Sequence, residues 1–198
     1  MFNPDGVLYG RLPGYGLSSL GHRMAAAAAD DLAARERPVT ALICSPLQRT
    51  RESAAPIGQA FDLEPRVDER LIEPRNRFEG GVVSREMRKP RNWPFLVNPW
   101  RPSWGEPYAS IHRRMRAAVV AAFEAAEGGD VVLVSHQLPI WALHLGLAGE
   151  RYMHDPRTRR CALSSITTFE RRDDDVVEVG YAEPARDLLA SSTDVGAV

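Results

Sequence analysis

Three side chains of this sequence combine a charged or proton-carrying group with a position just after an apolar segment. Arg49 follows "VTALICSPLQ", His136 follows "DVVLVS", and Glu73 lies in the loop that begins "RLIEPRN". A guanidinium binds phosphate oxygens through two parallel hydrogen bonds, and a carboxyl group in a crevice acts as a general acid. Taken singly, each residue also has an ordinary interpretation, as a solvated arginine, a core histidine or a surface ion pair.

The segments that carry these residues follow an α/β pattern. Short, nearly continuous apolar runs at 38–45 and 130–136 are typical of buried parallel strands, and each leads into a helical segment. Two such crossovers predict a three-layer α/β/α sandwich with a mostly parallel sheet. Ligands of such sheets bind beyond the carboxyl ends of the strands, which are here residues 45–49 and 135–137.

Further elements are expected along the rest of the chain. An alanine-rich helix is predicted over about 18–35, because Ser18 or Ser19 can cap its N-terminus. We also expect a short strand running into a loop over 65–73, a long amphipathic helix ending at Gly128, and a hairpin around an acidic turn over about 164–182.

Composition excludes several classes of protein. The 198 residues suit one domain, and a formal net charge of -1 gives the whole chain no electrostatic preference for nucleic acid or membrane. No apolar run reaches the length of about 18 residues that a transmembrane helix needs, and the sequence contains no signal peptide. With only Cys44 and Cys161, a reduced cytoplasmic protein is the simpler interpretation, although one disulfide stays open.

Several motifs, taken together and in order, resemble the histidine phosphatase superfamily, also called phosphoglycerate mutase-like. They are "SPLQR" at 45–49, "LIE" at 71–73 and "VSH" at 134–136. The opening "FNPDGVLYGRLPGYGLSSLGHRMA" resembles the stretch after that family's Arg-His-Gly motif, and "PSWGEPYASIHRRM" resembles its Gly-Glu-Ser segment. The resemblance implies a single domain over 1–183, with a cap insertion at about 78–105 and a flexible tail over 184–198.

The resemblance also implies roles for individual residues. Asn3, Arg49 and a protonated His136 look like the phosphate pocket, and Glu73 looks like the proton donor to the leaving oxygen. Ser45 looks structural, and Arg11 lies in a loop that often faces substrate. Gln137 stands where the family commonly has Gly, so we expect it at the pocket edge, where it contacts substrate. No metal or other cofactor is expected.

One departure is serious, because the attacking histidine of the family belongs to Arg-His-Gly and this sequence has no such motif. His22 is no substitute, since it lies on the first predicted helix. We therefore expect that the sequence begins a few residues late, that the first central strand and its nucleophile are missing, and that the chain as given is inactive.

The resulting hypothesis is a metal-independent histidine phosphatase that hydrolyses a small phosphomonoester through a phosphohistidine. Two alternatives remain open, phosphoglycerate mutase-type transfer and a non-catalytic, phosphate-binding pseudophosphatase. The segment 85–116 is basic and contains Trp93, Trp100 and Trp104. The net charge disfavours nucleic-acid binding there, which leaves a cap over the pocket or a solvated loop. A homodimer is an option that the sequence neither supports nor excludes.

Overall fold

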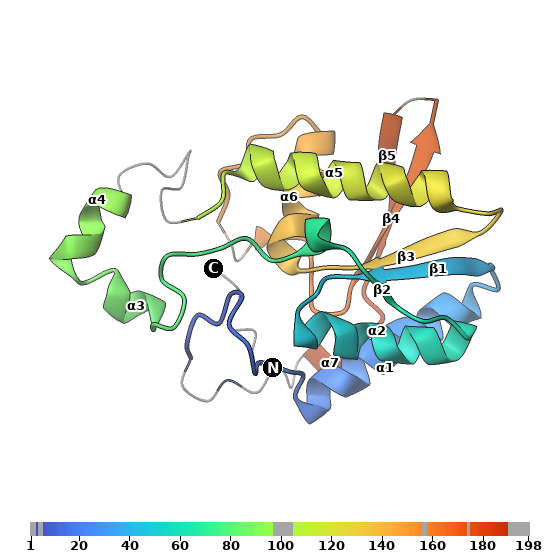
Figure 1. Ribbon diagram of the computed structural model, residues 1–198, viewed down its shortest axis with the longest axis horizontal. Coiled ribbons are helices and arrows are strands. Elements are labelled where there is room, and N and C mark those ends of the chain that lie inside the picture. The colour runs from blue at the N-terminus through green and yellow to red at the C-terminus, as the bar shows by residue number, and fades with distance from the viewer. Residues whose placement is uncertain (1–2, 4–5, 97–104, 156–157, 174, 190–198) are drawn as a thin grey trace.

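The computed structural model describes residues 3, 6–96, 105–155, 158–173 and 175–189 (Figure 1). Its helices, including the 3₁₀ turns η1 and η2, are α1 (Ser19–Ala34), α2 (Gln48–Phe61), η1 (Glu69–Leu71), α3 (Val83–Glu86), η2 (Pro90–Asn92), α4 (Trp93–Leu96), α5 (Tyr108–Ala125), α6 (Gln137–Leu147) and α7 (Arg186–Leu189). Its strands are β1 (Val39–Cys44), β2 (Arg66–Val67), β3 (Asp130–Val134), β4 (Ile166–Arg172) and β5 (Asp175–Ala182).

A parallel sheet of order β2-β1-β3 lies between two helical layers, and this confirms the predicted fold class. Helices α1 and α2 cover one face and α5 and α6 the other (Figure 1). The register of β1 on β3 pairs Cys44 with Val134. Both strands therefore end at the same edge of the sheet, and the residues that follow them meet there.

The remaining two strands form a separate antiparallel hairpin, β4-β5. Strand β3 is consequently the last strand of its sheet. Its apolar run, which predicts a strand buried on both faces, is only partly buried at all five positions. By contrast, Leu42 and Cys44 of the neighbouring β1 are 1% and 0% exposed.

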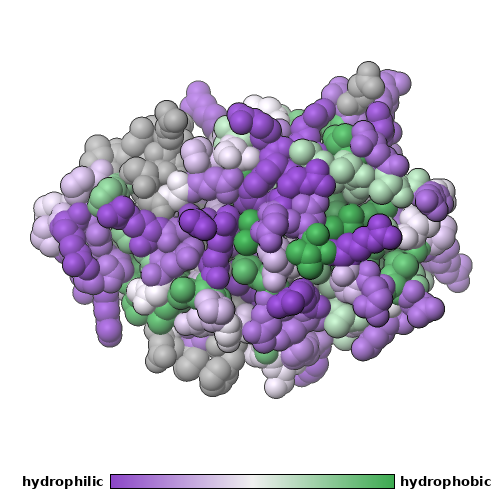
Figure 2. All heavy atoms as spheres, viewed as in Figure 1, coloured by the Kyte–Doolittle hydropathy of each residue, from purple (hydrophilic) through white to green (hydrophobic). Residues whose placement is uncertain are grey.

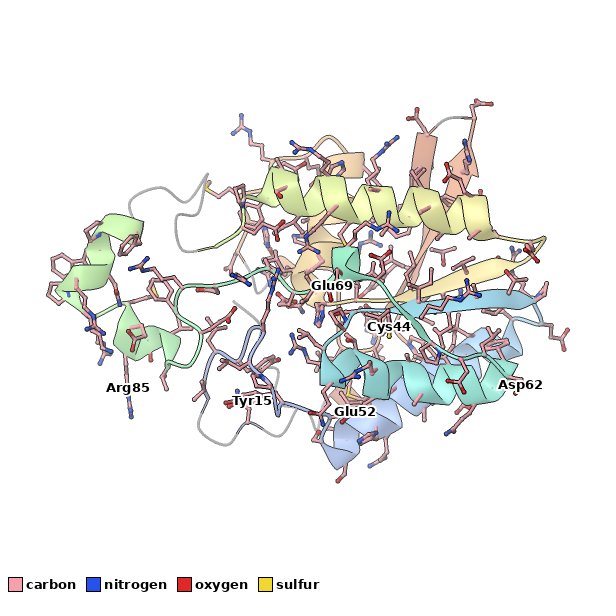
Figure 3. All side chains as sticks on the ribbon, viewed as in Figure 1. Tyr15, Cys44, Glu52, Asp62, Glu69 and Arg85 are labelled. Carbon is pink, nitrogen blue, oxygen red and sulfur yellow. The ribbon has the colours of Figure 1, made fainter. Side chains whose placement is uncertain are left out.

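The N-terminal loop is held against the helical layer beneath the sheet. The main-chain N–H of Leu17 donates to Glu52 on α2, and Ser18 Oγ accepts from Gly21 N, which makes Ser18 the N-cap of α1. Figure 3 shows Glu52 of α2 next to the loop that carries Tyr15. The Tyr15 ring stacks on Tyr9 with centroids 5.3 Å apart, so the two ends of the segment 9–15 pack against each other.

The predicted cap contains the short helices α3 and α4, which lie away from the sheet (Figure 1). Trp93 is 58% exposed there, and residues 97–104 of this cap lie outside the described residues. The first residues of the flexible tail predicted for 184–198 are ordered. Ala185 is 1% exposed, and the short helix α7 follows it. The rest of that tail, 190–198, is also outside the described residues.

Hydrophilic side chains cover most of the face shown in Figure 2, and apolar ones gather between the two helical layers. Among the helices that the structure describes, none is both long and apolar enough to cross a bilayer. Cys44 and Cys161 are both buried free thiols, so the open question of a disulfide between them is answered in the negative.

Candidate active site

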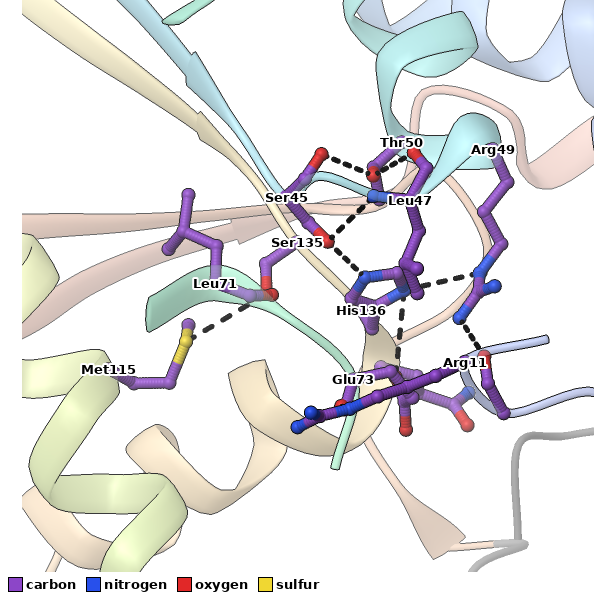
Figure 4. Close-up of polar contacts among 12 residues, drawn as sticks. Arg11, Ser45, Leu47, Arg49, Thr50, Leu71, Glu73, Met115, Ser135 and His136 are labelled. Atoms are coloured by element: carbon purple, nitrogen blue, oxygen red, sulfur yellow. Dashed lines mark hydrogen bonds and ion pairs between the residues drawn. The ribbon is translucent and has the colours of Figure 1, made fainter. Parts of the chain in front are cut away.

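Ser45 and His136 meet where β1 and β3 end (Figure 4). Ser45 N donates to Val134 O over 2.9 Å, which continues the ladder by one residue. Ser45 Oγ lies 2.7 Å from His136 Nε2, and both residues are buried. Ser45 was expected to be structural, and its hydroxyl orients the imidazole by a hydrogen bond to one ring nitrogen of His136.

Arg49 reaches the other ring nitrogen from the first turn of α2. Its Nε donates to His136 Nδ1 over 3.3 Å, and its Nη2 donates to Gly10 O over 2.9 Å. The Tyr9 ring lies against the guanidinium, with 5.0 Å between Cζ and the ring centroid. Because Nδ1 accepts a hydrogen bond from Arg49, the imidazole carries its proton on Nε2 and donates it to Ser45.

His136 is therefore neutral in the free protein, and its protonated form beside a bound phosphate stays a prediction. Burial lowers its pKa well below the usual value, and the positive charges of Arg49, Arg114 and Arg11 lower it further. A bound phosphate dianion would act in the opposite direction, because a nearby negative charge favours the imidazolium.

Glu73 lies in the loop after η1 and is 2% exposed. Its Oε2 is 3.6 Å from His136 Nδ1 and has no hydrogen-bond partner among the described residues. Burial raises the pKa of this carboxyl to about 7, although Arg49, Arg159, Arg114 and Arg11 pull it down. Near neutral pH the protonated and ionised forms of this carboxyl are consequently both populated, so it can act as a proton donor and as a proton acceptor.

The glycine-rich loop supplies main-chain contacts to this cluster. Arg11 Nε donates to the main-chain oxygen of Glu73, and Gly10 O accepts from Arg49. Gly10 has a φ of +38°, and a Cβ there would lie 2.3 Å from a Glu79 carboxylate oxygen. A side chain at position 10 would therefore push the Glu79 side chain aside and strain the backbone that presents Gly10 O to Arg49.

Gln137 borders the site and ties it to a second loop. Its Nε2 donates to Cys161 O over 2.8 Å, and its Oε1 accepts from Arg159 over 3.3 Å. Sequence reasoning missed both Arg159 and Tyr9. No motif distinguishes either residue, since one is an arginine among many and the other a tyrosine in a glycine-rich stretch.

Asn3 is not brought to the cluster. Its side-chain amide donates to Val7 O over 2.8 Å, and its oxygen accepts from Val7 N over 3.1 Å, so both ends close a turn of its own loop. Within the described part of the chain, no group of three or more His, Cys, Asp or Glu side chains is arranged to hold a metal ion.

Arg49, Glu73, His136 and Gln137 are among the residues that line a cavity of about 620 Å³. An arginine, a neutral imidazole with its proton fixed on Nε2, and a carboxyl that titrates near neutrality face each other there. The arrangement suits binding of a phosphoryl group and transfer of a proton to or from its ester oxygen.

Comparison with known proteins agrees with this chemistry. The family model of the histidine phosphatase superfamily (branch 1) matches residues 2–183. The chain belongs to the histidine phosphatase superfamily. It is 51% identical to the uncharacterized protein Rv0525 of Mycobacterium tuberculosis over 186 residues, which are 92% of this chain and 91% of the relative.

Other members of the histidine phosphatase superfamily carry named activities. Phosphoserine phosphatase 1 of Hydrogenobacter thermophilus is 28% identical over 153 residues, covering 75% of this chain and 71% of that protein. The structure of mycobacterial glucosyl-3-phosphoglycerate phosphatase with inorganic phosphate superposes with a TM-score of 0.58 at 28% identity, over 70% of this chain and 72% of that one. These similarities place the chain among phosphatases and phosphoryl-transfer proteins, and they confirm the phosphoglycerate mutase-like fold class.

Proposed function

We propose that this chain forms the phosphate pocket and general acid of a metal-independent histidine phosphatase. The observation that carries the proposal is the convergence of Arg49 and Glu73 on His136, with a Glu73 pKa of about 7. The substrate is a small phosphomonoester. The arginines around Glu73 support an anionic substrate, and so do the phosphatases named among the neighbours.

In the first step, an attacking imidazole forms a P–N bond as the P–O ester bond breaks. Arg49 binds the phosphoryl oxygens, and His136 takes up a proton as the dianion enters, which adds positive charge beside the transferring group. Protonated Glu73 gives its proton to the leaving alkoxide. In the second step, water attacks phosphorus, the Glu73 carboxylate accepts the water proton, and the P–N bond breaks to release inorganic phosphate.

The attacking imidazole, in this proposal, comes from residues outside the sequence 1–198. Both ring nitrogens of His136 are engaged, by Ser45 and by Arg49. His144 pairs with Glu178, and His154 accepts from Arg159 and contacts Tyr152 O. His22 and His112 lie on α1 and α5, and neither borders the cavity at the site.

Hydrolysis is favoured over mutase-type transfer, because a mutase must shield its phosphohistidine from water and nothing in the sequence points to such shielding. A non-catalytic, phosphate-binding role is the second candidate. It is favoured by one observation: within the described residues, His136 is the one imidazole in contact with Arg49.

Phosphate binding by the chain as given tests the pocket. We expect calorimetric titration with inorganic phosphate near pH 7 to show saturable binding with net proton uptake, because the anion raises the pKa of both Glu73 and His136. Arg49→Ala should abolish binding, whereas Arg51→Ala, an exposed arginine of the same helix, should not. Equal binding by both variants would contradict the proposed pocket.

Turnover separates the candidates. The chain extended at its N-terminus by a strand ending in Arg-His-Gly should hydrolyse p-nitrophenyl phosphate, and the 198-residue form should not. Isomerisation of 3-phosphoglycerate with negligible hydrolysis would assign mutase chemistry instead. Phosphate binding without turnover in the extended form would establish the non-catalytic role.

A further inference from the structure

The side chain of Arg159 connects Gln137, which borders the site, with the ring of His154. Its Nη1 donates to Gln137 Oε1 over 3.3 Å, and its Nε donates to His154 Nε2 over 2.8 Å. Because Nε2 accepts this hydrogen bond, the proton of His154 lies on Nδ1, which donates to Tyr152 O over 2.7 Å. Gln137 therefore holds the guanidinium on one side, and His154 holds it on the other.

The ring of His154 is itself fixed by its neighbours. It meets the Trp141 ring of α6 edge to face, with centroids 5.9 Å apart, and it lies 6.0 Å from the Tyr108 ring of α5. Burial lowers the pKa of His154 and the charge of Arg159 lowers it further, although the hydrogen bond to Tyr152 O acts the other way. Near neutral pH the imidazole is consequently uncharged, as the acceptor of the Arg159 hydrogen bond must be.

Gln137 is the second anchor of Arg159 and a departure from the histidine phosphatase family. The family commonly has Gly after the histidine that corresponds to His136, and Gly has no side chain to reach an arginine. The hydrogen bond from Gln137 Nε2 to Cys161 O, 2.8 Å long, orients the amide so that its oxygen accepts from Arg159. The place of the guanidinium therefore depends on a side chain that the common family pattern lacks.

Four positive charges act on the buried carboxyl of Glu73. Burial raises the pKa of this group to about 7, and the charges oppose burial. In decreasing order of effect, they are Arg49, Arg159, Arg114 and Arg11. The imidazole that faces Glu73, that of His136, is neutral in the free protein and adds no charge. Arg159 thus has the largest effect after Arg49, although it lies outside every motif of the sequence.

We propose that Arg159 is a positioning residue of this site, which Gln137 and His154 hold so that its charge favours release of the Glu73 proton. The role rests on the proposed function, in which Glu73 gives a proton in the first step and accepts one from water in the second. Burial alone would keep the carboxyl protonated, and a protonated carboxyl cannot accept that proton. Because Arg49 is then engaged by the phosphoryl oxygens, Arg159 supplies the largest remaining charge.

Carbon-13 NMR of the 198-residue chain tests this role without any turnover. With glutamate labelled at Cδ, the Glu73 signal is identified by its loss in Glu73→Gln, and its titration gives the pKa of the carboxyl. In Arg159→Gln we expect the titration midpoint to rise by about one pH unit, because a charge that favours the carboxylate has been removed. Arg160→Gln is the matched control. It removes the neighbouring arginine, which contacts Glu178, and should leave the Glu73 midpoint unchanged.

Variants of the two anchors separate the position of the charge from its presence. Gln137→Gly and His154→Phe keep Arg159 and remove one of its hydrogen bonds each. Each should raise the Glu73 midpoint by less than Arg159→Gln does, whereas His154→Gln retains an acceptor oxygen and should keep the parental value. A parental midpoint in Arg159→Gln would overturn the proposal, because a merely structural role lowers stability without moving the titration. Parental midpoints in both anchor variants would also overturn it, since the charge would then act without being positioned.

Kinetics of the chain extended by a strand ending in Arg-His-Gly distinguishes this role from the proposed function. The leaving group of p-nitrophenyl phosphate needs no proton, so the step that depends on Glu73 is the activation of water. In Arg159→Gln the ascending limb of kcat against pH should therefore move to higher pH together with the NMR midpoint. A limb that stays in place while the midpoint moves would keep the positioning role of Arg159 and remove Glu73 from the role of base.

Discussion

Two histidine–glutamate pairs in this protein use the same residue types in opposite ways. Between α6 and β5, His144 Nδ1 lies 2.6 Å from Glu178 Oε2, and Arg160 binds the other carboxylate oxygen. At the carboxyl edge of the sheet, His136 Nδ1 lies 3.6 Å from Glu73 Oε2, which has no hydrogen-bond partner among the described residues. The side chains of the first pair are 20% and 15% exposed, and those of the second 5% and 3%.

The comparison shows that burial and partners, rather than residue type, decide what such a pair does. Both carboxylate oxygens of Glu178 have partners, Arg160 for one and His144 for the other, and the residue links α6 to the hairpin. Oε2 of Glu73 has no hydrogen-bond partner among the described residues, and the pKa of the carboxyl is about 7. Near neutral pH the group can therefore both donate and accept a proton. Variants at the two pairs should therefore have different consequences.

The largest difference is expected between Arg49, which contacts His136, and Arg160, which contacts Glu178. In the histidine-extended protein, Arg49→Ala should lower kcat/KM by about 10³-fold or more, because the guanidinium stabilises charge on the phosphoryl oxygens in the transition state. Arg160→Ala removes the arginine of the other pair and should leave turnover near that of the parent. Steady-state kinetics with p-nitrophenyl phosphate measures both. Near-parental turnover of Arg49→Ala would show that another arginine holds the phosphate.

The two glutamates should differ in their dependence on the leaving group. Glu73→Gln should slow hydrolysis of an alkyl phosphate by about 100-fold or more, and that of p-nitrophenyl phosphate much less, because nitrophenolate leaves without a proton. Glu178→Gln should slow both substrates by one common factor or not at all. A series of aryl and alkyl esters measured at one pH supplies the comparison. The same factor for both substrates in Glu73→Gln would remove Glu73 from the role of general acid.

The third effect concerns stability and needs only the 198-residue chain. The pKa of Glu73 rises on folding from the ordinary 4.5 to about 7. Below pH 4.5 the carboxyl is protonated in both the folded and the unfolded state, so it does not lower the free energy of unfolding. As the pH rises through 7, the unfolded state is favoured because its carboxylate is solvated, and the free energy of unfolding falls. A rise of that size corresponds to about 3 kcal/mol. Glu73→Gln removes this cost, and its unfolding free energy relative to the parent should increase by about 3 kcal/mol between pH 4.5 and pH 8.

Urea unfolding at the two pH values measures this change. Glu178→Gln is the matched control, because it loses the contacts with His144 and Arg160 and should be less stable than the parent at pH 8. A stability difference between Glu73→Gln and the parent that stays constant across the range would mean that Glu73 is ionised in the folded protein throughout.

Much of the scaffold follows from the sequence. The apolar runs of β1 and β3, the Ser18 cap of α1 and the helix after Ser45 are local features, and local periodicity and capping chemistry are sufficient to predict them. The meeting of Arg49 and His136 also follows, since both come after parallel strands whose carboxyl ends share one edge.

Other features depend on contacts between segments far apart in the chain. Asn3 has the residue type of a phosphate ligand, but its loop folds so that the amide binds Val7. Tyr9 and Arg159 reach the site through loop conformations that no periodicity encodes. The apolar pattern of β3 likewise does not show that β3 is the last strand of its sheet and that β4 and β5 form a separate one.

The sequence alone determined which residue types stand at the ends of which strands, because a strand and its following turn are specified within about ten residues. Only the tertiary structure decided the protonation states. His136 is neutral and Glu73 titrates near pH 7 because each is enclosed by segments that are distant in sequence, and desolvation depends on everything packed around a group.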